Sequence, residues 1–199
     1  LPFGAAAPTV YGKSHLGFGL AEAREAFLTT LREKRGSSPV SNPCMPRGAT
    51  EVVNGDTYTG EGDFKRCTKM MAKLFPHTFV DGMPALSGRF YGFAYMYDRT
   101  AAIGLVDGTP TVYGQQEMSA GDISRAADAI CALDADATAK RFAAAQDVAK
   151  ANFFCGDTAY IVALLHSFGF DDSTKLVMTN KIHDVELVWT LGAILAKSS

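Results

Sequence analysis

The sequence predicts an α/β fold, and three observations point to it. Segments with strand-like alternation and segments with helical periodicity follow one another along most of the chain. Hydrophobic residues make up 47% of the composition and charged residues 20%, which is typical of a globular protein. The 199 residues are enough to bury a substantial core, as one large domain or two small ones.

The first quarter of the chain predicts one strand and one helix. Residues 1–8 are small, apolar and proline-punctuated, so we expect an irregular entry. Residues 9–18 favour a strand. Apolar side chains at helical spacing predict a helix over residues 20–34, with Gly36 as its stop. The Ser, Pro and Gly content of residues 36–49 predicts a long loop.

The next part of the chain predicts a hairpin, a helix and an aromatic strand. The Asn54-Gly55 pair lies between two short β-type runs, which is a strong hairpin signal. Residues 63–75 have helical spacing and end at a proline. Residues 89–98 are the most aromatic stretch, and we expect a buried strand that turns into a helix near Ala94.

The last part of the chain is predicted to be mainly helical. A capped helix is expected over residues 119–132, and two more over residues 135–148 and 153–168. A short strand follows at residues 175–179. An apolar pattern over residues 185–197 predicts a closing helix.

Charge and hydropathy exclude two classes of partner. Nineteen Lys and Arg against 21 Asp and Glu give a net charge of −2, so the chain lacks the basic field of a nucleic-acid binder. No apolar run approaches the ~18 residues that a membrane-spanning helix needs. The first residue is Leu1 and not Met, so we expect a processed product or a fragment of a longer protein.

The four cysteines allow two interpretations. None belongs to a C-x-x-C pair or lies at zinc-ligand spacing from a histidine, which argues against zinc. Of the three disulfide connectivities, spacing favours Cys44–Cys67 and Cys131–Cys155, because each closes a short loop worth about 3 kcal/mol. Four free buried thiols are the alternative. Bridges would place the chain in an oxidising compartment.

The titratable side chains form no recognised catalytic motif. The four histidines lie in neither an H-E-x-x-H motif nor an i, i+4 pair, so we take them as structural. Three acidic residues are candidates for general-base or metal chemistry, although caps and turns are the commoner role: Asp98, Asp157 and Asp184. Asp157 is expected to be the N-cap of the helix that follows it.

The aromatic stretch also has two interpretations. Tyr91, Tyr95 and Tyr97 alternate with Phe93, and such side chains usually build a core. The functional alternative is a flat surface that stacks on a base or a sugar.

Four segments, in order and at similar spacing, resemble one family. They are YGKSHLGFGL at residues 11–20, NPCMPR at 42–47, FYGFAYMYDR at 90–99, and FCGDTAYI at 154–161 with VWTLGA at 188–193. They resemble the motifs of the apyrase, or nucleoside triphosphate diphosphohydrolase, family. The Asp98-Arg99 pair is nearest to its secretory-pathway nucleoside diphosphatase (UDPase/GDPase) branch.

The resemblance implies an enzyme of two actin-like (RNase H-like) lobes with the active site between them. The family's phosphate loops and its catalytic glutamate lie upstream of all the matched segments. This chain is therefore expected to be the C-terminal portion, without a catalytic residue and inactive alone. Residues 1–184 would form most of the second lobe, and residues 185–199 a helix packed on the first lobe.

The resemblance also implies an activity. Such enzymes hydrolyse the terminal phosphate of nucleotides with a carboxylate-activated water and a Ca²⁺ or Mg²⁺ ion, here held mainly by the N-terminal half. The Asp98-Arg99 pair favours UDP and GDP, with ATP and ADP as further candidates. The expected partner is the N-terminal half of the same enzyme, and the expected location is the ER or Golgi lumen or outside the cell. A non-catalytic actin-like module that binds a nucleotide or a protein is the alternative.

Residue by residue, the resemblance transfers few roles. Trp189 matches a tryptophan near the metal and the phosphates. The family's cysteines pair as the spacing favours. Leu20 and Ala21 replace an Arg-Asp pair with which the cell-surface branch contacts the base. The residues that match the nucleobase-binding region, called the nucleobase wall below, are Tyr95, Tyr97 and Asp98 on one side, and Lys150 and Phe154 on the other.

Overall fold

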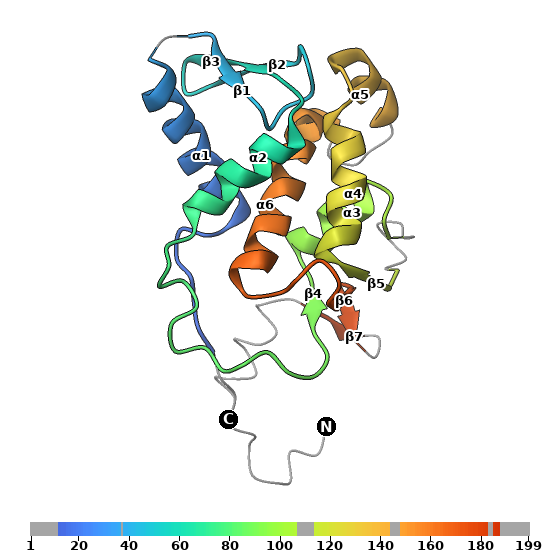
Figure 1. The fold of residues 1–199 in the computed structure, drawn as a ribbon. Helices are drawn as coiled ribbons and strands as arrows, with labels where there is room; N and C mark the ends of the chain where they lie inside the picture. The colour runs from blue at the N-terminus through green and yellow to red at the C-terminus, as the bar shows by residue number, and fades with distance from the viewer. Residues whose placement is uncertain (1–11, 37, 107–113, 144–147, 183–184, 188–199) are drawn as a thin grey trace, which may run out of the picture.

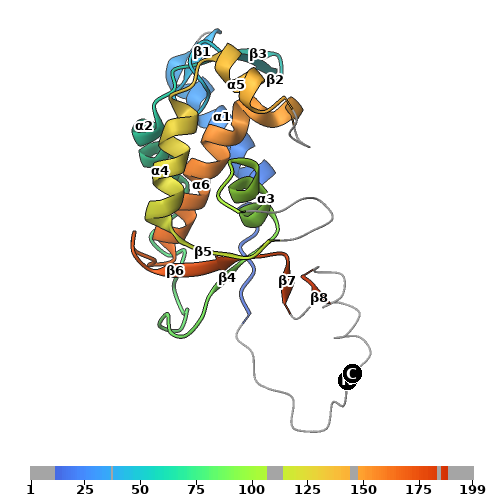
Figure 2. The same ribbon diagram turned by 90° about the vertical axis from the view of Figure 1, so that its right-hand side faces the viewer.

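The computed structural model describes residues 12–36, 38–106, 114–143, 148–182 and 185–187. Helices surround a central helix, with a small three-stranded sheet at each end of the bundle (Figures 1 and 2). The helices are α1 (Leu20–Arg35), α2 (Phe64–Met71), α3 (Tyr95–Ala102), α4 (Ala120–Cys131), α5 (Ala135–Arg141) and α6 (Phe154–Ser167), with 3₁₀ turns η1 (Ala72–Leu74) and η2 (Val148–Phe153). The predicted α/β class is confirmed, while the actin-like architecture stays a prediction.

The first sheet has the strand order β1-β3-β2. It contains β1 (Val40–Asn42), β2 (Thr50–Val53) and β3 (Asp56–Gly60), with β1 parallel and β2 antiparallel to β3. Asn54 and Gly55 form the two-residue turn between β2 and β3, with φ of 52° and 85°. Positive φ at both positions is what a type I′ turn requires, and the predicted hairpin is confirmed. The predicted loop over residues 36–49 therefore contains one short strand, β1.

The second sheet carries the aromatic stretch. Its order is β4-β6-β5, with β4 (Tyr91–Gly92) parallel and β5 (Gln116–Ser119) antiparallel to β6 (Lys175–Met178). Chain exit from β4 leads directly into α3, as the sequence predicts. Figure 2 shows this sheet across one end of α4 and α6, with α3 beside α6.

Helix α6 forms the centre of the core. Every residue from Phe154 to Leu165 is buried, and the helix packs against α1, α2, α3 and α4. A helix that is apolar on all sides is stable only when other elements surround it. Both favoured disulfides are present: Cys44–Cys67 joins the loop after β1 to α2, and Cys131–Cys155 joins α4 to α6, each with a Cα–Cα distance of 4.9 Å.

Three predicted elements differ from the structure. Residues 12–18 of the predicted strand form no strand, because Phe18 packs on the Phe75 and Phe79 rings, with centroids 5.6 and 4.9 Å away, and does not join a sheet. The helix predicted over residues 135–148 ends at Arg141. The prediction of a closing helix from residue 185 is wrong at its start, because Val185–Glu186 form strand β8, antiparallel to β7 (Lys181–Ile182). Residues 188–197 of that helix lie outside the described residues.

Among the described residues, no helix is both long enough and apolar enough to cross a membrane.

Candidate functional site

The turn between β4 and α3 positions the first half of the nucleobase wall. Ala94, the N-cap of α3, has φ 54° and ψ −130°, a backbone conformation that residues other than glycine rarely adopt. Its backbone N–H donates to Asn180 Oδ1 at 2.9 Å, and Asn180 Nδ2 lies 3.4 Å from Asp98 Oδ1. Asn180 therefore connects the end of β6 to the first turn of α3.

The two tyrosines of α3 differ in exposure. Tyr97 is buried at 5% exposure, and its phenol oxygen accepts a hydrogen bond from the Gly114 N–H at 3.0 Å. Tyr95 is half-buried, with its ring centroid 6.4 Å from that of Tyr160. Burial raises the pKa of Tyr95 to about 12, so its phenol is neutral at physiological pH. Asp98 is exposed. Of the wall residues on α3, Tyr95 and Asp98 are therefore the ones that reach solvent.

The second half of the wall comes from η2 and the start of α6. Lys150 is exposed on η2. Phe154 is fully buried, edge-to-face with Phe142 at 4.9 Å and 5.1 Å below the Arg99 guanidinium. In this structure the Phe154 ring has no free face to offer a base. Its neighbour Phe153 is half-buried instead, with the Arg24 guanidinium 4.7 Å from its ring centroid.

A buried ion cluster joins these elements. Asp157, 2% exposed, accepts hydrogen bonds from Arg24 Nη2 at 2.7 and 2.8 Å and from Arg99 Nε at 2.8 Å. Asp157 lies in the first turn of α6 and is not its N-cap, a position that Phe153 occupies, so the cap prediction is wrong. The cluster fixes α1 and α3 against the same turn of α6.

Burial and charge act in opposite directions on this carboxyl. Removal from water raises the pKa of Asp157, while the Arg24 and Arg99 guanidiniums lower it. A buried carboxylate is stable only when it is paired and hydrogen-bonded, and both conditions are met here. We therefore infer that the charged cluster stabilises the fold and does not transfer protons.

A small pocket lies beside this cluster, between α1 and α6. Its apolar lining includes Leu20 and Phe27 of α1, and Phe153 and Tyr160 from the α6 side. Arg24 and Asp157 are its charged lining residues. Leu20, which the resemblance aligns with a base-contacting arginine, therefore lies in a pocket whose lining residue Phe153 directly precedes Phe154 of the nucleobase wall.

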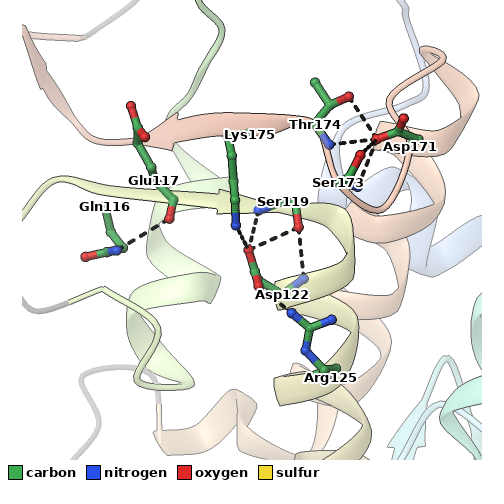
Figure 3. Close-up of polar contacts among 9 residues, drawn as sticks. All are labelled: Gln116, Glu117, Ser119, Asp122, Arg125, Asp171, Ser173, Thr174 and Lys175. Carbon is green, nitrogen blue, oxygen red and sulfur yellow. Dashed lines mark hydrogen bonds and ion pairs between the residues drawn. The ribbon is translucent and has the colours of Figure 1, made fainter.

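Two other carboxylates with shifted pKa values serve as structural acceptors (Figure 3). Asp122 closes a capping box with Ser119 at the start of α4 and is also bound by Lys175, and these contacts lower its pKa to about 2. Asp171 accepts hydrogen bonds from the backbone and hydroxyl groups of Ser173 and Thr174, which hold its pKa well below its usual range. Neither is poised as a general base near neutral pH.

The described part of the chain does not fit a divalent cation. Within it, no three His, Cys, Asp or Glu side chains gather closely enough to hold a metal ion. Of the three acidic candidates, Asp157 is paired with arginine side chains, and Asp98 contacts the Asn180 amide. Asp184 lies outside the described residues. Trp189 also lies outside them.

Sequence reasoning missed the residues that hold the site together. Arg24 and Asp157 are 133 positions apart, and Asn180 and Ala94 are 86 apart. One signal was available for Asp157: a carboxylate within a helix that is otherwise apolar on all sides needs buried cationic partners. The position of those partners depends on the fold and cannot be read from spacing.

Fold and cluster together define a disulfide-bonded α/β domain whose aromatic residues surround a buried ion cluster. A profile of the GDA1/CD39 (nucleoside phosphatase) family matches residues 4–199. The chain belongs to this family, which confirms the resemblance seen in the four motifs.

Three relatives illustrate the match. The chain is 33% identical over 195 residues to ectonucleoside triphosphate diphosphohydrolase 5 of Gallus gallus, covering 92% of this chain and 42% of the relative. It is 30% identical over 194 residues to nucleoside diphosphate phosphatase ENTPD5 of Homo sapiens, with the same coverage. It is 30% identical over 197 residues to ectonucleoside triphosphate diphosphohydrolase 6 of Mus musculus, covering 93% and 40%. The chain thus spans about two fifths of their length.

Proposed function

We propose that this chain is the C-terminal portion of a nucleoside phosphatase that hydrolyses the terminal phosphate of nucleoside di- or triphosphates. Its own contribution is the nucleobase wall. The observation that carries the proposal is the family match over residues 4–199, together with relatives named as nucleoside diphosphate phosphatase and triphosphate diphosphohydrolase. UDP and GDP are the first candidate substrates, with ATP and ADP next.

The exposed side chains of the wall suit a nucleobase. An ionised Asp98 only accepts hydrogen bonds, and uracil and guanine each present a ring N–H donor. The half-buried Tyr95 ring offers an aromatic face, and aromatic faces stack on any of the nucleobases. Lys150 provides a cation on the other side. Tyr97 and Phe154, both buried, support the wall from behind.

The remaining machinery is assigned to the N-terminal half of the enzyme. That half would hold the phosphate loops, the catalytic glutamate and most ligands of a Ca²⁺ or Mg²⁺ ion, which stabilises charge on the phosphate when bound. The two halves would form two actin-like lobes. Trp189 would lie near the phosphates, and residues 185–199 would pack on the first lobe.

The two disulfides support a location in the secretory pathway or outside the cell. Both bridges join segments of the core, so reduction would loosen the elements that carry the wall. We therefore propose the ER or Golgi lumen, or secretion.

The proposal is tested by phosphate release. The full-length protein is expected to release phosphate from UDP and GDP with Ca²⁺ or Mg²⁺ present, and to lose activity in EDTA. The isolated 199 residues are expected to be inactive under the same conditions. Robust hydrolysis by the isolated chain would overturn the assignment of the catalytic residues to the N-terminal half. No hydrolysis by the full-length protein would overturn the proposed activity.

A further inference from the structure

The pocket between α1 and α6 contains a polar group that the fold leaves partly unused. A guanidinium has five N–H donors in a rigid plane. Asp157 takes hydrogen bonds from Arg24 Nη2 and, at 3.3 Å, from Nε. Among the described residues, no acceptor takes the two N–H donors of Arg24 Nη1. The Arg24 side chain is 22% exposed, against 2% for Asp157, so it reaches solvent while it is held from behind.

The position of this guanidinium is fixed on two sides. The bidentate contact with Asp157 sets its plane, and the Phe153 ring covers one face at 4.7 Å. Charge-assisted, bidentate pairs of this kind are the most directional hydrogen bonds in proteins. A donor held in this way loses little further side-chain freedom when a ligand binds.

The surroundings of the Arg24 Nη1 donors are partly apolar. Leu20, Phe27 and Tyr160 line the same pocket. Ligand sites commonly combine such an apolar lining with a few fixed polar groups that orient the ligand. Phe153 directly precedes Phe154, and Asp157 also binds Arg99 of α3, so the pocket lies next to the elements that carry the two halves of the nucleobase wall.

We propose that Arg24 is a specificity-determining residue, which donates hydrogen bonds from Nη1 to a carbonyl oxygen of the nucleobase. This inference rests on the proposed function. Uracil carries a carbonyl oxygen where cytosine carries an amino group, and guanine carries one where adenine carries an amino group. A guanidinium only donates, so at this exocyclic position it meets an acceptor in the two carbonyl bases and an opposing amino donor in the two amino bases. Arg24 therefore selects UDP over CDP and GDP over ADP.

The experiment compares kcat/KM of the full-length protein for UDP, CDP, GDP and ADP. The wild type is expected to prefer UDP to CDP and GDP to ADP by about tenfold or more, as sites that hydrogen-bond a substrate group do. Arg24→Met keeps much of the side-chain bulk and removes the donors, so both ratios are expected to fall toward one. Arg24→Lys retains the charge without the planar fork and is expected to give intermediate ratios.

Arg32→Met is the matched control. Arg32 lies two turns further along α1 and pairs with Asp56 at 2.7 Å, away from the pocket lining. This variant is expected to leave both substrate ratios unchanged.

Each outcome has one interpretation. Equal loss of activity toward all four nucleotides in Arg24→Met would show a purely structural role and overturn the inference, as would a wild type that prefers CDP or ADP. Absence of any nucleotide hydrolysis by the wild type would instead contradict the proposed function. If Arg24→Met does not fold, the Arg24→Lys ratios and the thermal shifts of Arg24→Lys with UDP and CDP decide the question.

Discussion

Removal of the Asp157 carboxylate is the strongest test of the buried cluster. Asp157→Ala leaves the Arg99 side chain, 8% exposed, and the Arg24 side chain, 22% exposed, without their shared acceptor. Loss of one partner from a buried ion pair costs about 3–5 kcal/mol, because the remaining charge stays desolvated. The Arg24 side chain is partly solvated, which reduces its share of this desolvation cost. We therefore expect the free energy of unfolding to fall by about 3–4 kcal/mol.

The assay is urea denaturation at neutral pH, which compares midpoints at a common slope. Asp56→Ala is the matched control, because Asp56 accepts from Arg32 at the same 2.7 Å but with side chains 25% and 37% exposed. Exposed pairs are worth about 0–1 kcal/mol, so this control should cost at least 2 kcal/mol less than Asp157→Ala. Equal losses in the two variants would refute the claim that burial makes the Asp157 cluster important.

Two further predictions concern the rest of the fold. The pKa of Asp122 is lowered to about 2, so its contribution to stability is complete above the unfolded value near 3.8 and is lost as pH falls toward 2. Asp122→Asn should therefore reduce the stability at pH 7 and flatten its decline between pH 5 and 2. An acid transition by circular dichroism that is the same as in the wild type would contradict the capping role. A Cβ at Gly60 would lie 1.8 Å from the Pro46 carbonyl oxygen, while one at Gly12 meets nothing within 4 Å, so Gly60→Ala should destabilise by about 2 kcal/mol or more and Gly12→Ala by less than about 0.5, measured as thermal midpoints.

Local signals in the sequence predicted the local structure well. Asn54-Gly55 gave the hairpin, because only a few residue types accept positive φ at both turn positions. Ser119 and Asp122 gave the start of α4, because the capping box needs no partner outside its own turn. The aromatic strand that turns into a helix near Ala94 was also predicted correctly.

Predictions that depend on distant partners were less successful. Asp is a residue type that commonly caps helices, so Asp157 was predicted to be a cap. Only the fold brings Arg24 and Arg99 to its carboxylate. Phe18 has the pattern of a strand residue, but its ring joins the Phe75 and Phe79 rings. In each case a long-range contact outweighs a local preference of about 1 kcal/mol.

The nucleobase wall shows the same division. The motif around the aromatic strand identified α3 and the start of α6, which the buried cluster brings to one place. It did not distinguish exposed side chains from buried ones, so Phe154 was included among the contact residues although its ring is fully buried. Burial depends on which helix covers which, and a single sequence does not contain that information.

The KM for UDP of the full-length Asp98→Asn variant tests the central claim most directly. Asp98→Asn should raise KM by about 10- to 100-fold with a smaller change in kcat, the loss expected for a hydrogen bond to a charged group that is made in both the ground and transition states. Asp128→Asn, an exposed carboxylate on α4, should leave KM unchanged. An unchanged KM in Asp98→Asn would contradict the assignment of this chain as the nucleobase wall.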